Sequence, residues 1–194
     1  MVDRDFFLIL KQVVKFMIND KEFLPVNIAV VTISDSRTQE NDKSGDVLNQ
    51  KITEAGHLVL VREIVKDEFQ MISNLFSNLI KNEKIDVVIS TGGTGLTGRD
   101  ITPEVMQTLF EKSIDGFGEM FRWMSYKKIG TSALQSRALA GVANGTYIFC
   151  LPGSPSACRD GWDDILVHQL DIRHKPCNFV EIMPRLNEHK NSRS

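Results

Sequence analysis

Three short runs of this sequence are almost wholly apolar and rich in β-branched residues. They are NIAVVTIS at 27–34, IDVVIS at 85–90 and TYIFCL at 146–151. Runs of this length and composition are typical of strands that are buried on both faces of a parallel sheet. Each run therefore predicts a core strand.

Helical patterns lie between these runs. Residues 72–80 carry apolar side chains at i, i+3, i+4, i+7 and i+8, which predicts an amphipathic helix. A second helix is expected at 44–55, with Ser44 as its N-cap and Gly56 at its end, and a further strand at 57–65. This alternation of strands and helices predicts right-handed βαβ units and therefore the α/β fold class.

The second half of the chain is expected to be mostly helical. Thr102 and Pro103 have the residue types of an N-cap and a first helical position, which predicts a helix to about Phe110. The other helices expected are at 116–128, at 132–140 and from Pro155 to about Leu170. We divide the chain into an N-terminal helical extension at 1–25, one α/β domain at 26–184 and a polar tail at 185–194.

Charge and cysteine content exclude several classes of protein. The net charge of -2 gives no broad basic surface for nucleic acid or an anionic membrane. No run is apolar over a bilayer-spanning length, and the N-terminus has no basic leader. The three cysteines are widely spaced, and the four histidines have no zinc-binding spacing. We therefore expect a cytoplasmic protein in which any anionic ligand meets a local site.

A glycine-rich turn directly follows the run at 85–90, and its residues are Thr91, Gly92, Gly93, Thr94 and Gly95. Glycine loses much backbone entropy on folding, so it favours positions with positive φ or with a closely approaching ligand. The carboxyl ends of parallel strands form the ligand-binding edge of an α/β sheet. We therefore expect the amides of this turn to bind an anion such as phosphate. The alternative is a tight turn without a ligand.

Two well-known phosphate motifs match this turn only in part. Gly93, Gly95 and Gly98 satisfy the GxGxxG pattern of dinucleotide-binding proteins, but the expected helix begins too late for that motif. The glycine spacing of a Walker A loop is also present, but Arg99 and Asp100 stand where that loop needs Lys and Ser or Thr. A nicotinamide-dependent oxidoreductase is therefore a weak alternative.

Two aspartates are candidates for catalysis. Asp100 follows the glycine turn, and Asp67 follows the strand expected at 57–65, at an equivalent carboxyl edge. A carboxylate beside an anion-binding turn can hold Mg²⁺ or act as a positioned acid or base. The alternatives are a helix cap for Asp100 and a simple turn residue for Asp67.

Further polar residues follow other strands. Pro152, Gly153 and Ser154 come after the run at 146–151, and Ser34 and Asp35 end or follow the first run. We expect them to share one rim with the glycine turn, with Ser154 also capping the last helix. This convergence of strand ends predicts a binding site.

Other polar and aromatic residues are expected to be structural. Asp42, Lys43, Ser44 and Asp46 could contribute to the site, but a charged run before a helix is more often a solvated cap. Aromatic side chains at 117–126 have helical spacing and are expected to fill the core or a subunit contact. Glu119 and Arg122 are expected to form a helix ion pair. Arg137 could meet either a phosphate or solvent.

Seven short motifs follow one another along the chain: TISDSR at 32–37, DKSGD at 42–46, TGGTG at 91–95, RDITPE at 99–104, GFGEMFR at 116–122, SR at 136–137 and LPGSP at 151–155. Together they resemble the MoaB/MogA family of molybdenum cofactor biosynthesis, also seen in the G domain of gephyrin. The resemblance covers roughly residues 26–184, and the stretches 130–146 and 169–179 look more like MoaB than MogA.

The resemblance implies a three-layer α/β/α fold around a mostly parallel sheet, with molybdopterin bound at the TGGTG and PGSP loops. MogA-like members join the pterin phosphate to AMP from Mg-ATP and release pyrophosphate. The family's two carboxylates correspond to Asp67 and Asp100, which would position Mg²⁺ or the nucleotide. Some MoaB proteins have another residue at the position of Asp67 and are considered inactive, so its presence favours an active molybdopterin adenylyltransferase. The substrate-binding residues expected are Ser34, Asp35, Thr91, Gly92, Gly93, Thr94, Gly95, Pro152, Gly153 and Ser154.

An alternative function within the same pathway is a catalytically silent molybdopterin carrier, which would keep the pocket and leave the chemistry to another protein. The resemblance also implies a homo-oligomer, either a trimer or a hexamer. Contact with other molybdenum cofactor biosynthesis proteins is left open.

Overall fold

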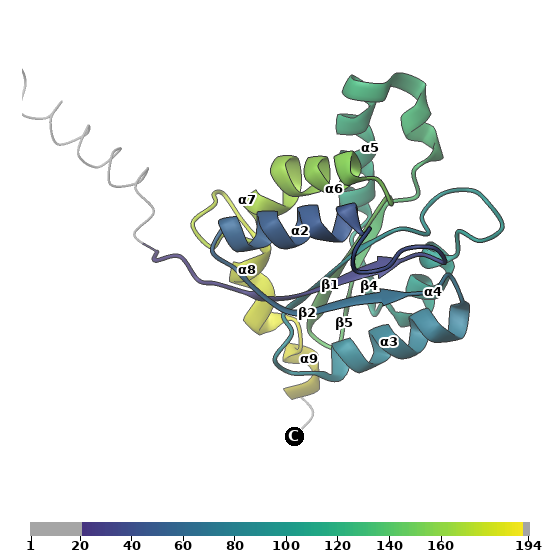
Figure 1. The fold of residues 1–194 in the computed structure, drawn as a ribbon. Helices are drawn as coiled ribbons and strands as arrows, with labels where there is room; N and C mark the ends of the chain where they lie inside the picture. The colour runs from purple at the N-terminus through teal and green to yellow at the C-terminus, as the bar shows by residue number, and fades with distance from the viewer. Residues whose placement is uncertain (1–20, 192–194) are drawn as a thin grey trace, which may run out of the picture.

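The computed structural model describes residues 21–191, which form a layered α/β domain (Figure 1). A six-stranded sheet has the order β2-β1-β3-β6-β5-β4. Its strands are β1 (Asn27–Ile33), β2 (Leu58–Val65), β3 (Val87–Thr91), β4 (Lys112–Ser113), β5 (Leu139–Ala143) and β6 (Thr146–Leu151). The pairs from β2 to β6 are parallel, while β5 pairs antiparallel with both β6 and β4. The predicted mostly parallel sheet is therefore confirmed.

Helices cover both faces of this sheet. α2 (Lys43–Glu54) and α6 (Pro155–Gly161) lie on one face, and α3 (Phe69–Lys81) and α4 (Thr102–Leu109) lie on the other (Figure 1). The remaining helical segments are α5 (Asp115–Ile129), a 3₁₀ helix (Gly130–Gln135), a π-helix (Trp162–Leu166), α7 (Val167–Gln169), α8 (Phe179–Ile182), a 3₁₀ helix (Met183–Arg185) and α9 (Glu188–Asn191). The three-layer fold class is confirmed. Within residues 21–191, no helix has the length and apolar character needed to cross a bilayer.

Each face of the sheet buries its own apolar core, because successive side chains of a strand point to opposite faces. In β3, Val87 and Ile89 belong to the core with α2 and α6, whereas Val88 belongs to the core with α3 and α4. The apolar stripe of α3 buries Ile72 and Phe76 against the second core. Burial on both faces explains why the strand runs contain so few polar residues.

The structure corrects two predicted helix caps. The N-cap of α2 is Asp42, while Ser44 lies inside the helix and donates its hydroxyl hydrogen to the Gly153 carbonyl. Thr102 is the first residue of α4, and its hydroxyl donates to the Gly92 carbonyl instead of capping the helix. Both hydroxyl groups bind a strand-end loop, so tertiary contacts replace the local cap that their residue types suggested.

The helix predicted at 132–140 is wrong. The helical conformation ends at Gln135, and β5 pairs antiparallel with β6 through a turn in which Asn144 and Gly145 have φ angles of 49° and 84°. Alanine-rich sequence favours a helix locally, but an Asn-Gly pair between two strands is the signature of a tight hairpin. That pair was the signal that could have predicted β5.

The predicted segments at the two ends of the chain are described only in part. The helix predicted at residues 4–20 of the N-terminal extension lies outside the described residues, and residues 21–26 have no regular secondary structure. In the polar tail, α9 is helical, and Lys190 donates to the side chains of Asn144 and Glu111. Part of this tail is therefore attached to the domain.

The strand connections create a topological switch point between β1 and β3. From β1 the chain passes through α2 to β2 on one side, and from β2 it passes through α3 to β3 on the other side of β1. In open parallel sheets, ligands bind in the crevice at the carboxyl ends of the strands at such a point. The loops after Ile33 and Thr91 should therefore border a ligand site.

Candidate functional site

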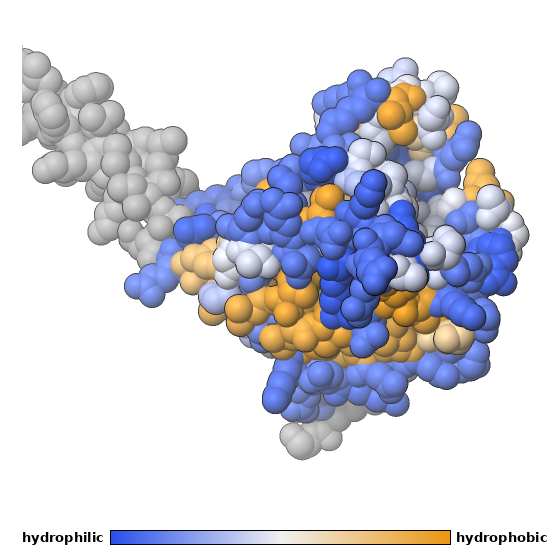
Figure 2. Space-filling model, in the orientation of Figure 1, coloured by the Kyte–Doolittle hydropathy of each residue, from blue (hydrophilic) through white to orange (hydrophobic). Residues whose placement is uncertain are grey.

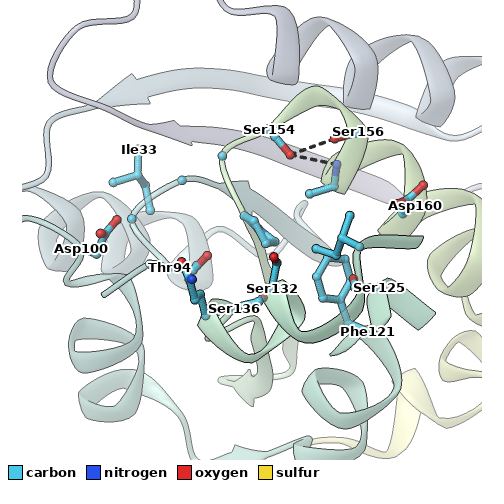
Figure 3. A pocket seen from close by; sticks show the side chains of 18 of the residues that line it. Ile33, Thr94, Asp100, Phe121, Ser125, Ser132, Ser136, Ser154, Ser156 and Asp160 are labelled. Atoms are coloured by element: carbon cyan, nitrogen blue, oxygen red, sulfur yellow. Dashed lines mark hydrogen bonds between the residues drawn. The ribbon is translucent and has the colours of Figure 1, made fainter. Parts of the chain in front are cut away.

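A cavity of about 520 Å³ opens at the carboxyl ends of β1, β3 and β6 (Figure 3). Asp100 lies toward one end of the cavity, and Asp160 lies toward the other. The predicted site residues that line it are Ser34, Gly92, Gly93, Thr94, Gly95, Asp100, Pro152, Gly153 and Ser154. The other three predicted residues, Asp35, Asp67 and Thr91, are not among the residues that line the cavity.

The glycine turn after β3 adopts backbone conformations that require glycine. Gly92 and Gly93 have φ angles of +109° and +63°, and a Cβ on Gly92 would lie 2.1 Å from the Ile33 carbonyl oxygen. Thr102 holds the turn, because its N–H donates to the Gly93 carbonyl at 3.0 Å. The N–H groups of Gly93 and Thr94 donate to no other residue within 21–191. These amides are therefore free to bind an anion in the cavity.

Asp67 and Asp100 both approach this turn. A Cβ placed on Gly93 would lie 2.7 Å from Oδ1 of Asp67, and one placed on Gly95 would lie 2.8 Å from Oδ2 of Asp100. Oδ1 of Asp67 is buried and has no hydrogen-bond partner in the described chain. Burial raises the pKa of Asp67, and the negative charges of Asp35 and Asp100 raise it further. A bound cation would relieve both effects, so the residues present fit Mg²⁺.

Asp100 is held as a carboxylate. Its Oδ2 accepts hydrogen bonds from the Thr97 N–H at 2.8 Å and from the Thr97 hydroxyl at 2.6 Å. Burial acts to raise the pKa of Asp100, but these bonds, the Gly95 N–H and the charge of Arg137 together lower it. Asp100 therefore supplies a negative charge at neutral pH, whereas the charge on Asp67 is the less stable of the two.

Arginine side chains fix the loops around the two acids. Arg137 donates to the carbonyls of Gly95 and Asp100, each at 2.7 Å, and pairs with Glu104. It therefore holds the loop at 95–100 through protein contacts that neither predicted role for Arg137 included. Arg99 binds the Asp35 carboxylate with two nitrogens at 3.0 and 2.9 Å. Asp35 thus ties neighbouring loops together.

The side chains near the turn do not form a complete metal cage. In the chain from 21 to 191, no group of three or more His, Cys, Asp or Glu residues could hold a metal ion. Mg²⁺ commonly uses one or two carboxylates and completes its coordination with water and substrate phosphates. A pair of acids beside free amides is compatible with that arrangement.

The wall formed by α5 and α6 contains residues that the sequence interpretation missed. Phe121, Ser125 and Lys128 of α5 line the cavity opposite the glycine turn, and Lys128 pairs with Asp160 of α6 at 2.7 Å. Assigning the aromatic residues of this segment to packing was correct for Phe121, which is 3% exposed. Helical spacing alone did not show that its ring also borders a cavity.

Two charged residues also depart from their predicted roles. Arg122 donates to the carbonyls of Ser136 and Ala138, and the described chain has no ion pair between Arg122 and Glu119. Arg37, which was not among the predicted site residues, lines the cavity. Its place in the TISDSR motif directly after β1 was the signal that could have identified it.

The fold and the site together define a class of protein. It is an open α/β domain with a cavity at the carboxyl edge of its sheet, where free amides and two carboxylates lie close together, as in domains that bind anionic ligands at this edge.

Comparison with known proteins identifies the family within that class. Residues 29–172 match the family model described as "Probable molybdopterin binding domain". Molybdenum cofactor biosynthesis protein B of Escherichia coli K12 is 49% identical over 158 residues, covering 81% of this chain and 93% of that protein. Its Bacillus cereus counterpart is 44% identical over 146 residues, covering 75% and 86%. The chain belongs to the MoaB/MogA family of molybdenum cofactor biosynthesis proteins.

Solved structures agree with this assignment. A crystal structure of molybdenum cofactor biosynthesis protein B superposes with a TM-score of 0.78 at 38% identity, covering 87% of this chain and 99% of that one. The tungsten cofactor synthesizing protein MoaB from Pyrococcus furiosus superposes with a TM-score of 0.65 at 35% identity, covering 73% and 91%. Both similarities extend over most of the domain.

Proposed function

We propose that this cleft binds molybdopterin and that the chain adenylylates the terminal phosphate of the pterin with Mg-ATP. The observation that carries the proposal is the approach of Asp67 and Asp100 to a glycine turn in which the N–H groups of Gly93 and Thr94 are free. The molybdopterin-binding family model supports the choice of pterin. The cavity volume of about 520 Å³ suits a small-molecule ligand.

In the proposed reaction, an oxygen of the pterin phosphate attacks the α-phosphorus of ATP. A new P–O bond joins the pterin phosphate to the α-phosphorus. The bond between the α-phosphorus and the oxygen that bridges it to the β-phosphate breaks, and pyrophosphate leaves with that electron pair. The amides of Gly93 and Thr94 would bind phosphate oxygens, and Ser154 lines the same cavity. Catalysis would consist mainly of alignment and charge neutralisation, as in other phosphoryl-type transfers.

Asp67 and Asp100 would hold the magnesium ion. When bound, Mg²⁺ supplies positive charge that neutralises the phosphate groups. The unpartnered Oδ1 of Asp67 supports this role, and Asp100, with its lowered pKa, brings a stable negative charge to the site. Asp67 would thus offer an oxygen atom that has no other partner, and Asp100 would supply a negative charge that persists at neutral pH.

Pyrophosphate release from molybdopterin and Mg-ATP tests the proposal directly. Asp67→Asn and Asp100→Asn are each expected to slow release by about 100-fold, comparable to the loss of one electrostatic contact in other active sites. Asp163→Asn is the matched control, because Asp163 is a surface acid paired with Lys51 at 2.9 Å. Its activity should equal that of the wild type.

Binding measurements separate this proposal from its alternatives. A catalytically silent carrier would bind molybdopterin and release no pyrophosphate, and that outcome would reduce the function to binding. ATP, but not NAD, is expected to raise the melting temperature, because ligands that bind only the folded state stabilise it. Protection by NAD alone would instead favour an oxidoreductase.

We also propose that the chain works in the cytoplasm as a homo-oligomer, either a trimer or a hexamer. All three cysteines are free thiols, as is usual in a reducing compartment. Trp123 and Tyr126 of α5 are 62% and 59% exposed, and Leu58 and Leu60 lie exposed on edge strand β2, where Figure 2 shows an apolar band. Large apolar surfaces of this kind commonly mark protein contacts. A light-scattering mass equal to one chain would contradict the oligomer.

A further inference from the structure

Asp42 is a buried carboxylate at the start of α2. Its side chain is 0% exposed, and it accepts hydrogen bonds from the Thr32 hydroxyl at 2.7 Å and from the Gly45 N–H at 3.0 Å. Guanidinium nitrogens of Arg37 and Arg62 lie 3.2 and 3.3 Å from it. A helix cap needs only a bond to a backbone N–H and can stay solvated. The predicted solvated cap is therefore wrong for Asp42, whose burial between two arginines exceeds what capping requires.

Arg37 connects Asp42 to the cleft. Its Nη1 donates to Oδ1 of Asp42, and its Nη2 donates to the Gly153 carbonyl at 2.6 Å. The guanidinium group is a rigid planar fork, so holding one nitrogen on Asp42 also sets the direction of the other. Because Arg37 lines the cavity, this orientation is set at the ligand site itself.

The Gly153 carbonyl is held from a second side. The Ser44 hydroxyl donates to the same oxygen at 2.9 Å. A trans peptide is planar, with its C=O and the following N–H pointing in opposite directions. Holding the Gly153 oxygen therefore turns the Ser154 N–H away from Arg37 and Ser44. In the described chain this N–H donates to no other residue.

Gly153 also touches the glycine turn. A Cβ on Gly153 would lie 3.4 Å from Cα of Gly92, so the backbones of the two loops pass close to each other at this point. The position of Gly153 therefore limits the position of the turn. A continuous set of contacts leads from Asp42 through Arg37 and Gly153 to Gly92.

The contacts of Arg62 indicate that Arg37 does more than balance the charge of Asp42. Arg62 already lies 3.3 Å from Asp42, and it also pairs with Asp46 at 2.8 Å. If Asp42 served only as the N-cap of α2, the hydrogen bond from the Gly45 N–H and the ion pair with Arg62 would be sufficient partners for its carboxylate. The contact with Arg37 instead links the helix start to a loop 116 residues away from Arg37 in the sequence.

We propose that Asp42 is a positioning residue of the cleft, which acts through Arg37 to hold the Gly153–Ser154 peptide in place for a ligand anion. The identity of that anion rests on the proposed function, whereas the positioning role rests on the contacts alone. Asp42 itself would not touch the ligand.

The first test needs no ligand. In Asp42→Asn, the backbone amide NMR signals of Gly153, Ser154 and Gly92 are expected to shift or broaden relative to the wild type. Asp46→Asn is the matched control: it removes a carboxylate from the same helix and from Arg62, but Asp46 has no contact with Arg37. Unchanged Gly153 and Ser154 signals in Asp42→Asn would overturn the proposal, even if the variant were less stable.

The second test measures binding by calorimetric titration with Mg-ATP and with molybdopterin. Asp42→Asn and Arg37→Gln should each weaken binding of at least one probe by about tenfold, a usual effect of losing a group that orients a ligand-binding residue. The double variant should be no weaker than Arg37→Gln, because Asp42 acts through Arg37. Multiplied effects would show an independent, merely structural role and overturn the proposal.

A third variant covers the case in which Asp42→Asn does not fold. Arg37→Lys keeps the positive charge but loses the planar fork, so it should weaken binding by about tenfold as well. Wild-type affinity in Arg37→Lys would contradict the proposal. If the wild type bound neither Mg-ATP nor molybdopterin, the proposed function would fail, while the Gly153 and Ser154 signals would still decide the positioning role.

Discussion

The carboxylate of Asp67 lies so close to Gly93 that a Cβ on this glycine would stand 2.7 Å from its Oδ1 atom. The same Cβ would stand 2.3 Å from Oγ1 of Thr102. Only a hydrogen atom fits in this space. Because Gly93 has no side chain, the Asp67 carboxylate can reach the backbone of the glycine turn.

Alanine at Gly93 should lower the stability of the fold. We expect Gly93→Ala to lower the free energy of unfolding by about 2 kcal/mol or more, because left-handed φ is costly for alanine and the methyl group displaces Thr102 or Asp67. Urea denaturation measures this effect. Gly98→Ala is the control, since its Cβ would meet nothing within 4 Å, and its change should stay within about 0.5 kcal/mol. Equal stability of the two variants would contradict the close packing at Gly93.

Removing the charge of Asp67 should cost activity without costing stability. Burial and the charges of Asp35 and Asp100 raise its pKa from 3.8 in the folded protein. Folding thus favours the protonated form of Asp67. The stability that this form contributes is fully present below pH 3.8 and is lost as the pH rises through the raised folded-state pKa. At pH 7, in the absence of ligand, Asp67→Asn should unfold at the same urea concentration as the wild type or a higher one.

Asp100→Asn should behave in the opposite way. The pKa of Asp100 is lowered, so its contribution to stability is present above pH 3.8 and lost as the pH falls through the folded-state value. At pH 7 this variant should therefore be less stable than Asp67→Asn in the same urea titration. The reverse order would mean that the two acids have been assigned the wrong electrostatic environments.

The core opposite the binding cleft should affect stability alone. Phe76 of α3 is fully buried in the core with α4, so Phe76→Ala is expected to lower the free energy of unfolding by about 3–5 kcal/mol. Phe69, on the same helix, is 46% exposed, so Phe69→Ala should have a much smaller effect. At a temperature where both variants are folded, their affinity for Mg-ATP should equal that of the wild type.

The fold was largely predictable because burial on both faces leaves a simple pattern. The short apolar runs predicted the buried strands β1, β3 and β6 correctly. The apolar spacing of residues 72–80 likewise matches the buried face of α3. β5 was missed because LAGVA contains small residues that also suit a helix. Its strand conformation comes from pairing with β6, which is a tertiary contact.

The site was predictable where it depends on strand ends and not where it depends on buried charge. Glycine and proline loops after the strands identified the rim, because that edge is shared by all parallel strands. Asp42 resembled a solvated cap, since the partners that bury it, Thr32, Arg37 and Arg62, belong to other segments. The residues next to Asp42 in the sequence do not indicate which other side chains will pack against it in the fold.

His57 should make stability depend on pH below neutrality. Its ring is buried, and Nδ1 accepts a hydrogen bond from the Val26 N–H at 3.2 Å, which requires a neutral imidazole. Burial lowers the pKa of His57 from 6.5, against a smaller opposing effect of Asp171. The stability it contributes is therefore present above pH 6.5 and lost as the pH falls through the lower folded-state value.

Thermal unfolding between about pH 7 and about pH 5 tests this dependence. The wild-type melting temperature should fall across this range, whereas His57→Gln, which does not titrate, should start lower and fall less. His168→Gln is the control, because it removes an exposed histidine and leaves the hydrogen bond between Val26 and His57 in place. If His57→Gln kept the full slope, the loss of stability would have to come from another group, and the neutral acceptor beside Val26 would not explain it.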